Sequence, residues 1–284
     1  MLRIKLAKSL GFCSGVSRAI NIAEKTLNKE KGKVYSLGSI IHNHEEIRRL
    51  RQKGFISVKS LDEVENSSCV ILPSHGTPRH IIDAGRKKNL KFIDVTCPYV
   101  SHVQKICKKL FIDKFTVIII GDSHHPEVKA LIDLAPGAII IESSKDIGVN
   151  QFSNKKIGII SQTTQSKEKF FNIVSLILKR NQDMQKAHIF NTICLDTSHR
   201  QEEVKNLARA VDRLVVIGSR TSANTKRLLA LGRRVNSKTF LAEKDNEALI
   251  NNLNGAVNIG VISGASAPRW LVDRIIKKIK ESRK

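Results

Sequence analysis

Three of the five cysteines stand where an expected strand gives way to an expected helix. Cys13 lies in LAKSLGFCSGV, Cys97 in FIDVTCPYV and Cys194 in FNTICLDT. The N–H groups at a helix N-terminus favour a thiolate, so these positions suit metal binding or nucleophilic chemistry. Three convergent thiolates can hold a zinc ion with one further ligand, or a cubane iron–sulfur cluster in which one iron lacks a protein ligand. The spacing does not choose between these, nor does it exclude three separate core cysteines.

The other two cysteines are expected to be packing residues. Cys69 lies in an apolar strand and Cys107 on a helix flank in KICKKL, where a cysteine usually behaves as a small hydrophobic residue. Five cysteines are an odd number and too sparse for a disulfide framework. We therefore expect thiols in a reducing compartment.

Polar residues follow several other expected strands. Parallel sheets bind ligands beyond the carboxyl ends of their strands, so one site can collect these residues. Imidazoles, hydroxyls and an amide suit a phosphate or diphosphate, whose oxygens need many donors, although each residue also has an ordinary role as a helix cap. The candidates are His42 in GSIIHN, His75 in LPSHGT, His125 in GDSHHPEV, Thr163 in IISQTTQS, Ser222 and Asn224 in GSRTSANT, and Ser266 in SGASAP.

Glu127 is a carboxylate in a His- and hydroxyl-rich segment at these strand ends, which makes it the candidate proton carrier. His125 and Thr163 are the residues able to relay its proton. A Glu that follows Pro126 also complements the dipole of a helix that begins there, and both roles are compatible.

Short β-branched segments alternate with amphipathic ones along the whole chain, which predicts an α/β protein with parallel sheets and crossover helices. Strands are expected at 2–7, 34–38, 69–73, 91–95, 116–120, 156–160, 213–218 and 258–263, and helices at 16–29, 101–111, 167–179, 200–211 and 270–281. The three cysteines recur at similar intervals, one in each of three α/β units. We expect domains at 1–96, 97–193 and 194–284, each presenting one thiol at a shared centre.

The composition is typical of a globular cytoplasmic protein. The 284 residues are 41% hydrophobic and carry a formal charge of +23. No apolar run is long enough to cross a membrane, and the N-terminal MLRIKLAKSL lacks the apolar stretch of a signal peptide. The charge favours acidic partners such as phosphorylated metabolites or redox proteins. Only 5% of the residues are aromatic and the basic residues are spread along the chain, which disfavours a nucleic-acid surface.

Together, the motifs resemble a known family. GFCSGVSRAI, SIIHN, SHG, DVTCP, HPEV, SQTTQ, TIC followed by RQEEV, GSRTSAN and GASAP occur in the order and spacing typical of the LytB family of 4-hydroxy-3-methylbut-2-enyl diphosphate reductases. The resemblance covers nearly the whole chain. It implies three similar α/β domains in a trefoil-like arrangement around one 4Fe-4S cluster, which has three Cys ligands and one open iron. The residues that match the family's ligands are Cys13, Cys97 and Cys194.

The family resemblance also implies an activity. It is the last step of the non-mevalonate isoprenoid pathway, the reductive dehydroxylation of (E)-4-hydroxy-3-methylbut-2-enyl diphosphate to isopentenyl and dimethylallyl diphosphates. By motif match, Glu127 delivers protons, and the substrate is bound by His42, His75, His125, Thr163, Ser222, Asn224 and Ser266. Electrons would come from an acidic ferredoxin or flavodoxin, to which the basic surface is suited.

The chain departs from the family pattern at three positions. Ala223 stands where a second serine is usual, which removes one hydroxyl contact to the phosphate. Asp196 replaces a small residue beside the third thiol, where a carboxylate would lower the cluster potential, and Asp122 also differs. Two other hypotheses remain open. One is a zinc-dependent hydrolase that uses three thiolates and an activated water, and the other is a basic nucleic-acid-binding protein in which the cysteines only pack.

Overall fold

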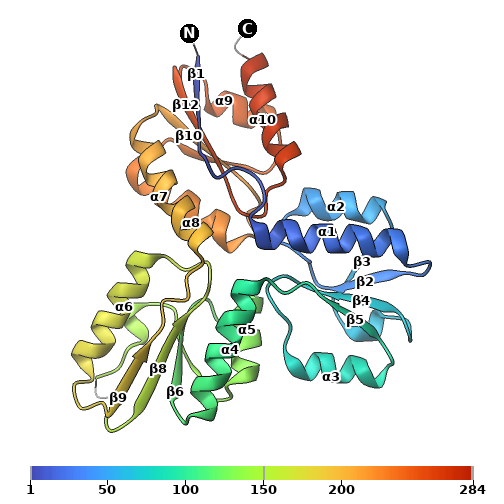
Figure 1. The fold of residues 1–284 in the computed structure, drawn as a ribbon. Helices are drawn as coiled ribbons and strands as arrows, with labels where there is room; N and C mark the ends of the chain where they lie inside the picture. Colours follow the sequence, from blue (N-terminus) through green and yellow to red (C-terminus); the bar gives the residue numbers. More distant parts are fainter. Residues whose placement is uncertain (1, 150, 283–284) are drawn as a thin grey trace. The chain divides into compact units, whose positions relative to one another are not determined.

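The computed structural model describes residues 2–149 and 151–282, which contain three sheets of four parallel strands each (Figure 1). The chain divides into two compact units. Unit 1 comprises Met1–Ser17, Ile41–Gln52 and Leu195–Lys284, and unit 2 comprises Arg18–Ile40 and Lys53–Cys194. The parallel sheets and their crossover helices confirm the predicted α/β class.

The sheet of unit 1 joins the N-terminal strand to three strands from the last third of the chain. Its order is β1 (Arg3–Leu6), β12 (Asn258–Ser263), β10 (Arg213–Ile217) and β11 (Thr239–Ala242). The helices assigned wholly to this unit are α2 (His44–Gln52), α7 (Leu195–Arg209), α8 (Ala223–Val235), α9 (Glu247–Asn252) and α10 (Arg269–Glu281). Helix α1 (Ser14–Lys29) begins in unit 1 and ends in unit 2.

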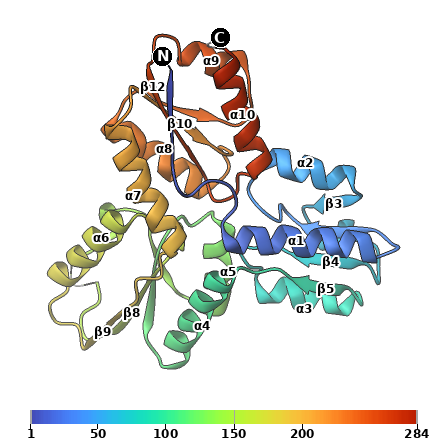
Figure 2. The same cartoon turned by 45° about the horizontal axis from the view of Figure 1, so that its top comes forward.

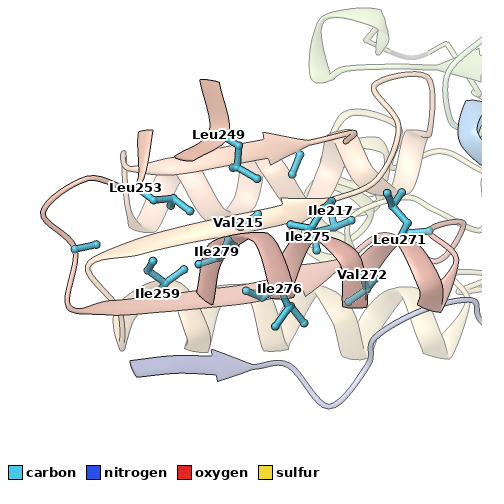
Figure 3. Packing of buried hydrophobic residues seen from close by; sticks show 14 residues of the cluster. Val215, Ile217, Leu249, Leu253, Ile259, Leu271, Val272, Ile275, Ile276 and Ile279 are labelled. Carbon is cyan, nitrogen blue, oxygen red and sulfur yellow. The ribbon is translucent and has the colours of Figure 1, made fainter. Parts of the chain in front are cut away.

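Successive side chains of β10 point to opposite faces of this sheet, and both faces are covered. Val215 and Ile217 pack with the apolar side of α10, including Leu271 and Ile275 (Figure 3). On the other face, α7 and α8 pack against residues such as Val216. Burial on both faces explains why the central strands are uninterrupted apolar runs.

Unit 2 holds two sheets. The first has the order β3 (Phe55–Val58), β2 (Val34–Leu37), β4 (Cys69–Leu72) and β5 (Lys91–Asp94), accompanied by the 3-10 helix η1 (Leu61–Glu63) and by α3 (Arg79–Lys87). The second has the order β7 (Ile139–Ile141), β6 (Thr116–Ile120), β8 (Lys156–Ser161) and β9 (Lys186–Ile189). Its helices are α4 (Pro98–Ile112), α5 (Pro126–Leu134), the 3-10 helix η2 (Ser144–Asp146) and α6 (Lys167–Arg180).

The second sheet of unit 2 is also covered on both faces. Ile118 of β6 packs with residues of α6, and its neighbour Ile119 packs with α4 and α5. Figure 2 shows α6 on one side of β8 and α4 on the other. The carboxyl ends of the strands are thereby held by a rigid apolar core, and the loops that follow them carry the predicted site residues.

Every strand expected from the sequence is present, and four further strands, β3, β7, β9 and β11, complete the sheets. The expected helix at 200–211 begins earlier, since α7 starts at Leu195, directly after Cys194. The predicted domain limits at 1–96, 97–193 and 194–284 stay a prediction. Within the described residues, no helix combines the length and the apolar character needed to span a membrane.

Candidate active site

Glu127 and Thr163 form a buried hydrogen-bonded pair in unit 2. Glu127 lies in the first turn of α5, and Thr163 lies in the loop after β8. The Thr163 N–H donates to Oε1 of Glu127 at 2.7 Å, and the Thr163 hydroxyl donates to Oε2 at 2.8 Å. Both carboxylate oxygens are therefore occupied by one residue. The predicted proximity of these two residues is confirmed.

Burial gives Glu127 the protonation behaviour of a proton carrier. Its side chain is only 2% exposed. Desolvation raises the pKa of Glu127 from 4.5 to about 7, while the two hydrogen bonds from Thr163 act in the opposite direction. A carboxyl group with this pKa exists in both forms near neutral pH, as a general acid requires.

Two of the predicted histidines lie beside this pair. His125 is the N-cap of α5, and its Nδ1 accepts the N–H of Glu127 at 3.1 Å. Because Nδ1 is an acceptor, the proton of the neutral ring is on Nε2. The ring of His75 meets that of His125 edge-on, with centroids 6.4 Å apart. The loop carrying His75 needs Gly76, whose φ is +87° and at which an added Cβ would lie 2.5 Å from Nε2 of Gln104.

Each proposed ligand cysteine directly precedes a helix. Cys13 stands before α1, Cys97 is the N-cap of α4 with Pro98 at the first helical position, and Cys194 stands before α7. All three are half-buried. The predicted placement at helix N-termini is confirmed for Cys13 and Cys97, whereas the helix after Cys194 begins five residues earlier than expected, at Leu195. Each sulfur therefore has a local environment that favours a thiolate ligand.

The backbone N–H of each of these cysteines is hydrogen-bonded to a loop that carries a predicted substrate residue. Within unit 2, the N–H of Cys97 donates to the carbonyl of Ser74, next to His75, at 2.9 Å. The N–H of Cys194 donates to the carbonyl of Thr163 at 2.9 Å. In unit 1 the same arrangement recurs, because the N–H of Cys13 donates to the carbonyl of Ala265 at 3.0 Å, and Ser266 follows.

The remaining two cysteines belong to the core, as expected. Cys69 is 5% exposed in β4, and Cys107 is fully buried in α4 with its sulfur 3.5 Å from the carbonyl oxygen of Leu131. Burial raises the pKa of the Cys107 thiol to about 12, which keeps it protonated. Neither has the helix-terminal position shared by the other three.

The N-terminus of α8 in unit 1 carries two of the predicted substrate residues, Ser222 and Asn224. Ser222 is the N-cap, with its hydroxyl accepting the N–H of Thr225 at 3.3 Å. Asn224 is 4% exposed, and within the described part of the chain neither its Oδ1 nor its Nδ2 has a hydrogen-bond partner. A buried amide without partners costs about 1–3 kcal/mol, so this arrangement fits a polar ligand such as a phosphate oxygen.

His42 and Ser266 also lie together in unit 1. The Ser266 hydroxyl donates to the backbone carbonyl of His42 at 3.1 Å, which links the loops SIIHN and GASAP. Desolvation lowers the pKa of His42, and the nearby charges of Lys226 and His44 add to this effect. The imidazole is therefore neutral at pH 7, and it can act as a hydrogen-bond donor or acceptor.

Comparison with known proteins places the chain in a family. The LytB protein family model matches residues 4–280. The chain belongs to the LytB family. It is 37% identical to the 4-hydroxy-3-methylbut-2-enyl diphosphate reductase of Aquifex aeolicus strain VF5, covering 99% of this chain and 97% of that protein. It is 38% identical to the enzyme of the same name from Geobacter metallireducens, covering 99% and 98%.

Solved structures of such reductases share the fold. One, described as the terminal enzyme of the non-mevalonate pathway, has a TM-score of 0.72 and 37% identity, covering 99% of this chain and all of that one (100%). The E-1-hydroxy-2-methyl-but-2-enyl-4-diphosphate reductase from Plasmodium falciparum has a TM-score of 0.89 and 28% identity, covering 96% and 86%. The resemblance inferred from the motifs is confirmed over the full length.

The structure clarifies one departure from the LytB pattern. Asp196 lies in the first turn of α7, and its carboxylate is held by the guanidinium of Arg200 through a 2.8 Å contact from Nε to Oδ2. Its negative charge is therefore largely neutralised within the same helix. Ala223, at the first position of α8, offers no hydroxyl at the N-terminus of this helix.

Sequence reasoning assigned no role to Arg200, and it did not predict that Ser161 and Thr192 are hydrogen-bonded to each other near the third thiol. Thr192 accepts the N–H of Ser161 at 2.7 Å and donates to the Ser161 carbonyl at 2.6 Å, which fixes the strand ends before Thr163 and Cys194. Arg200 begins the RQEEV motif, and an acidic residue stands four positions earlier in the chain, but neither feature indicated its role. That spacing is common on solvent-exposed helix faces and did not distinguish it.

Proposed function

We propose that this chain is a reductase that removes the hydroxyl group of (E)-4-hydroxy-3-methylbut-2-enyl diphosphate. The overall change is ROH + 2 e⁻ + 2 H⁺ → RH + H₂O, and the products are isopentenyl and dimethylallyl diphosphates. The observation that carries the proposal is the Glu127–Thr163 pair, a buried carboxyl group with a pKa of about 7 whose partner Thr163 is backbone-bonded to Cys194. Membership of the LytB family favours this activity over a zinc-dependent hydrolase or a nucleic-acid-binding protein.

We further propose that Cys13, Cys97 and Cys194 hold a 4Fe-4S cluster as its three protein ligands, with one iron left open. The donor set fits this group, since three half-buried cysteines precede helices while Cys69 and Cys107 are sealed in the core. Redox and Lewis-acid chemistry would come from the bound cluster. Electrons would be delivered by an acidic ferredoxin or flavodoxin, which suits a chain with a net charge of +23.

The chain's own residues bind the substrate and handle the protons. Asn224, Ser222, Ser266 and His42 would bind the diphosphate, because buried amide, hydroxyl and imidazole groups provide donors for its oxygens. His75, His125 and Thr163 would complete the set of substrate-binding residues.

Glu127 would protonate the departing hydroxyl, because a poor leaving group must leave as water. The hydroxyl of Thr163 keeps the carboxyl group in one orientation and lies on the path along which the proton would move.

The test is Glu127→Gln, which keeps the size of the side chain and an oxygen that can accept the Thr163 N–H. We expect the variant to retain its iron–sulfur absorbance and its affinity for the substrate, while turnover falls about 10²- to 10⁴-fold, as is typical when a general acid is removed. Turnover would be measured anaerobically with the allylic diphosphate and an artificial reductant. Near-normal turnover would remove Glu127 from this role, and a colourless wild-type protein that binds zinc would favour the hydrolase.

A further inference from the structure

A buried arginine in unit 1 donates two of its hydrogen bonds to the loop that ends at Cys13. The side chain of Arg200, on α7, is only 2% exposed. Its Nη1 donates to the carbonyls of Ser9 at 2.8 Å and Ser263 at 2.9 Å, and its Nη2 donates to the carbonyl of Gly11 at 3.1 Å. The loop of residues 8–13 is called the Cys13 loop below.

Asp196 supplies the counter-charge that a buried guanidinium requires. It accepts from Nε of Arg200 at 2.8 Å and from Nη2 at 3.4 Å. The five N–H groups of the guanidinium are then all used, three on backbone carbonyls and two on the carboxylate. This paired fork fixes the orientation of the side chain, which a lysine ammonium could not reproduce.

Other hydrogen bonds attach the same loop to α7 and to the end of β12. Glu203, one turn along α7, accepts the N–H groups of Lys8 at 2.9 Å and Ser9 at 3.1 Å. The hydroxyl of Ser263, at the end of β12, accepts the N–H of Gly11 at 2.9 Å. Arg200 is the member of this set that contacts both the loop and the end of β12, and it does so from α7.

We propose that Arg200, oriented by Asp196, is a positioning residue that holds the Cys13 loop against α7 and β12 and so fixes how Cys13 presents its thiol. The part of this inference that concerns a ligand role for Cys13 rests on the proposed function. The effect of Arg200 passes through the backbone carbonyls on either side of Leu10.

Hydrogen exchange of the Cys13 loop tests the inference directly. In Arg200→Met the aliphatic stem remains but the five donors are lost, so the amides of residues 8–13 should exchange about tenfold faster in anaerobically purified full-length protein. Arg200→Lys should not restore the slow exchange, because one ammonium cannot reach three carbonyls and the carboxylate. Asp196→Asn, which keeps the size but removes the charge, should give a smaller increase of about two- to fivefold, and it remains available if Arg200→Met does not fold.

Arg209→Met is the matched control, since Arg209 lies on the same helix but is exposed and donates to the exposed side chain of Asn206. We expect no change in that variant. Unchanged exchange of the loop in both Arg200→Met and Asp196→Asn would overturn the proposal. So would a uniform increase that includes β6 in unit 2, because Arg200 would then contribute to general stability and not to the loop.

A second readout concerns the cluster. In the anaerobic protein, a chelator should remove iron about tenfold faster from Arg200→Met than from Arg209→Met, since a loosened loop presents Cys13 less constantly. Equal rates of iron loss would overturn the link to the cluster. The exchange result does not depend on iron or turnover, so failure of the proposed function would appear separately, as a wild-type protein without reductase activity.

Discussion

Replacement of Thr163 by valine isolates one of the two hydrogen bonds that set the proton affinity of Glu127. The hydroxyl of Thr163 donates to Oε2 at 2.8 Å, whereas its N–H donates to Oε1 and is retained by any residue except proline. Valine has nearly the same shape as threonine and lacks only the hydroxyl donor. The backbone bond from Cys194 to the carbonyl of residue 163 also remains.

The expected shift in the pKa of Glu127 follows from the free energy of the hydrogen bond that the Thr163 hydroxyl donates. A hydrogen bond to a charged group contributes about 1.5–3 kcal/mol, and 1.36 kcal/mol corresponds to one pKa unit. Because the lost donor stabilises the ionised form, the pKa of Glu127 should rise from about 7 to about 8 or 9 in Thr163→Val. Its protonated form is the one required, so turnover falls as the pH rises through this pKa. In the pH profile of turnover, the decline at high pH (the falling limb) should therefore move to higher pH in Thr163→Val.

Steady-state turnover measured anaerobically between pH 6 and pH 10, at saturating substrate, checks this shift. Thr163→Ser keeps the hydroxyl and should leave the limb near its wild-type position, while Glu127→Gln should abolish the limb. A reduced turnover in Thr163→Val does not bear on the argument, since Thr163 is also a proposed substrate contact. If the falling limb stays in place or moves to lower pH in Thr163→Val, the Thr163 hydroxyl does not lower the pKa of Glu127.

Three further outcomes are expected. Burial raises the pKa of Glu127 from 4.5 to about 7, so its contribution to folding stability is complete below pH 4.5 and is lost as the pH rises through 7. Relative to Glu127→Gln, the free energy of unfolding of the wild-type protein should therefore fall by about 3 kcal/mol over this range, as measured by urea titrations. Ala223→Ser should restore a hydroxyl at the N-terminus of α8 and lower the KM for the diphosphate about two- to tenfold, as measured by steady-state kinetics. Cys97→Ala should lose the iron–sulfur absorbance, whereas Cys107→Ala, which changes only a core thiol, should keep it and its iron content.

The sequence patterns reveal all six central strands, and also two edge strands, β1 and β5, that are largely exposed. TVIII of β6 is an apolar run because both faces of the sheet are covered. The four strands that went unrecognised, β3, β7, β9 and β11, are all at sheet edges. β7 has only three residues, and β9, with the sequence KAHI, has neither an alternating pattern nor a full apolar run. Their pairing depends on the neighbouring strand, which local sequence does not show.

The candidate site residues could be predicted from the sequence more readily than the residues that hold their loops in place. Cysteine, histidine and hydroxyl residues after buried strands are recognisable by residue type, and Glu127 follows a proline at a helix start. Arg200 acts on backbone carbonyls of Ser9 and Gly11, which lie 191 and 189 positions away in the chain. A backbone carbonyl has no residue type, so no sequence motif marks the partner of such an arginine.

In the proposed function, the repeated backbone link would let neighbouring but separate residues bind the cofactor and the substrate. Cys97, Cys194 and Cys13 are joined through their N–H groups to the loops that carry His75, Thr163 and Ser266 respectively. These links use main-chain atoms only, so the side chains of the loops would be left to bind substrate and could vary without breaking the connection. For a related reason we expect the chain to tolerate alanine at position 223, since the N-cap and the buried amide of α8 remain. The three cysteines would have no such freedom as cluster ligands, because no other side chain supplies a thiolate.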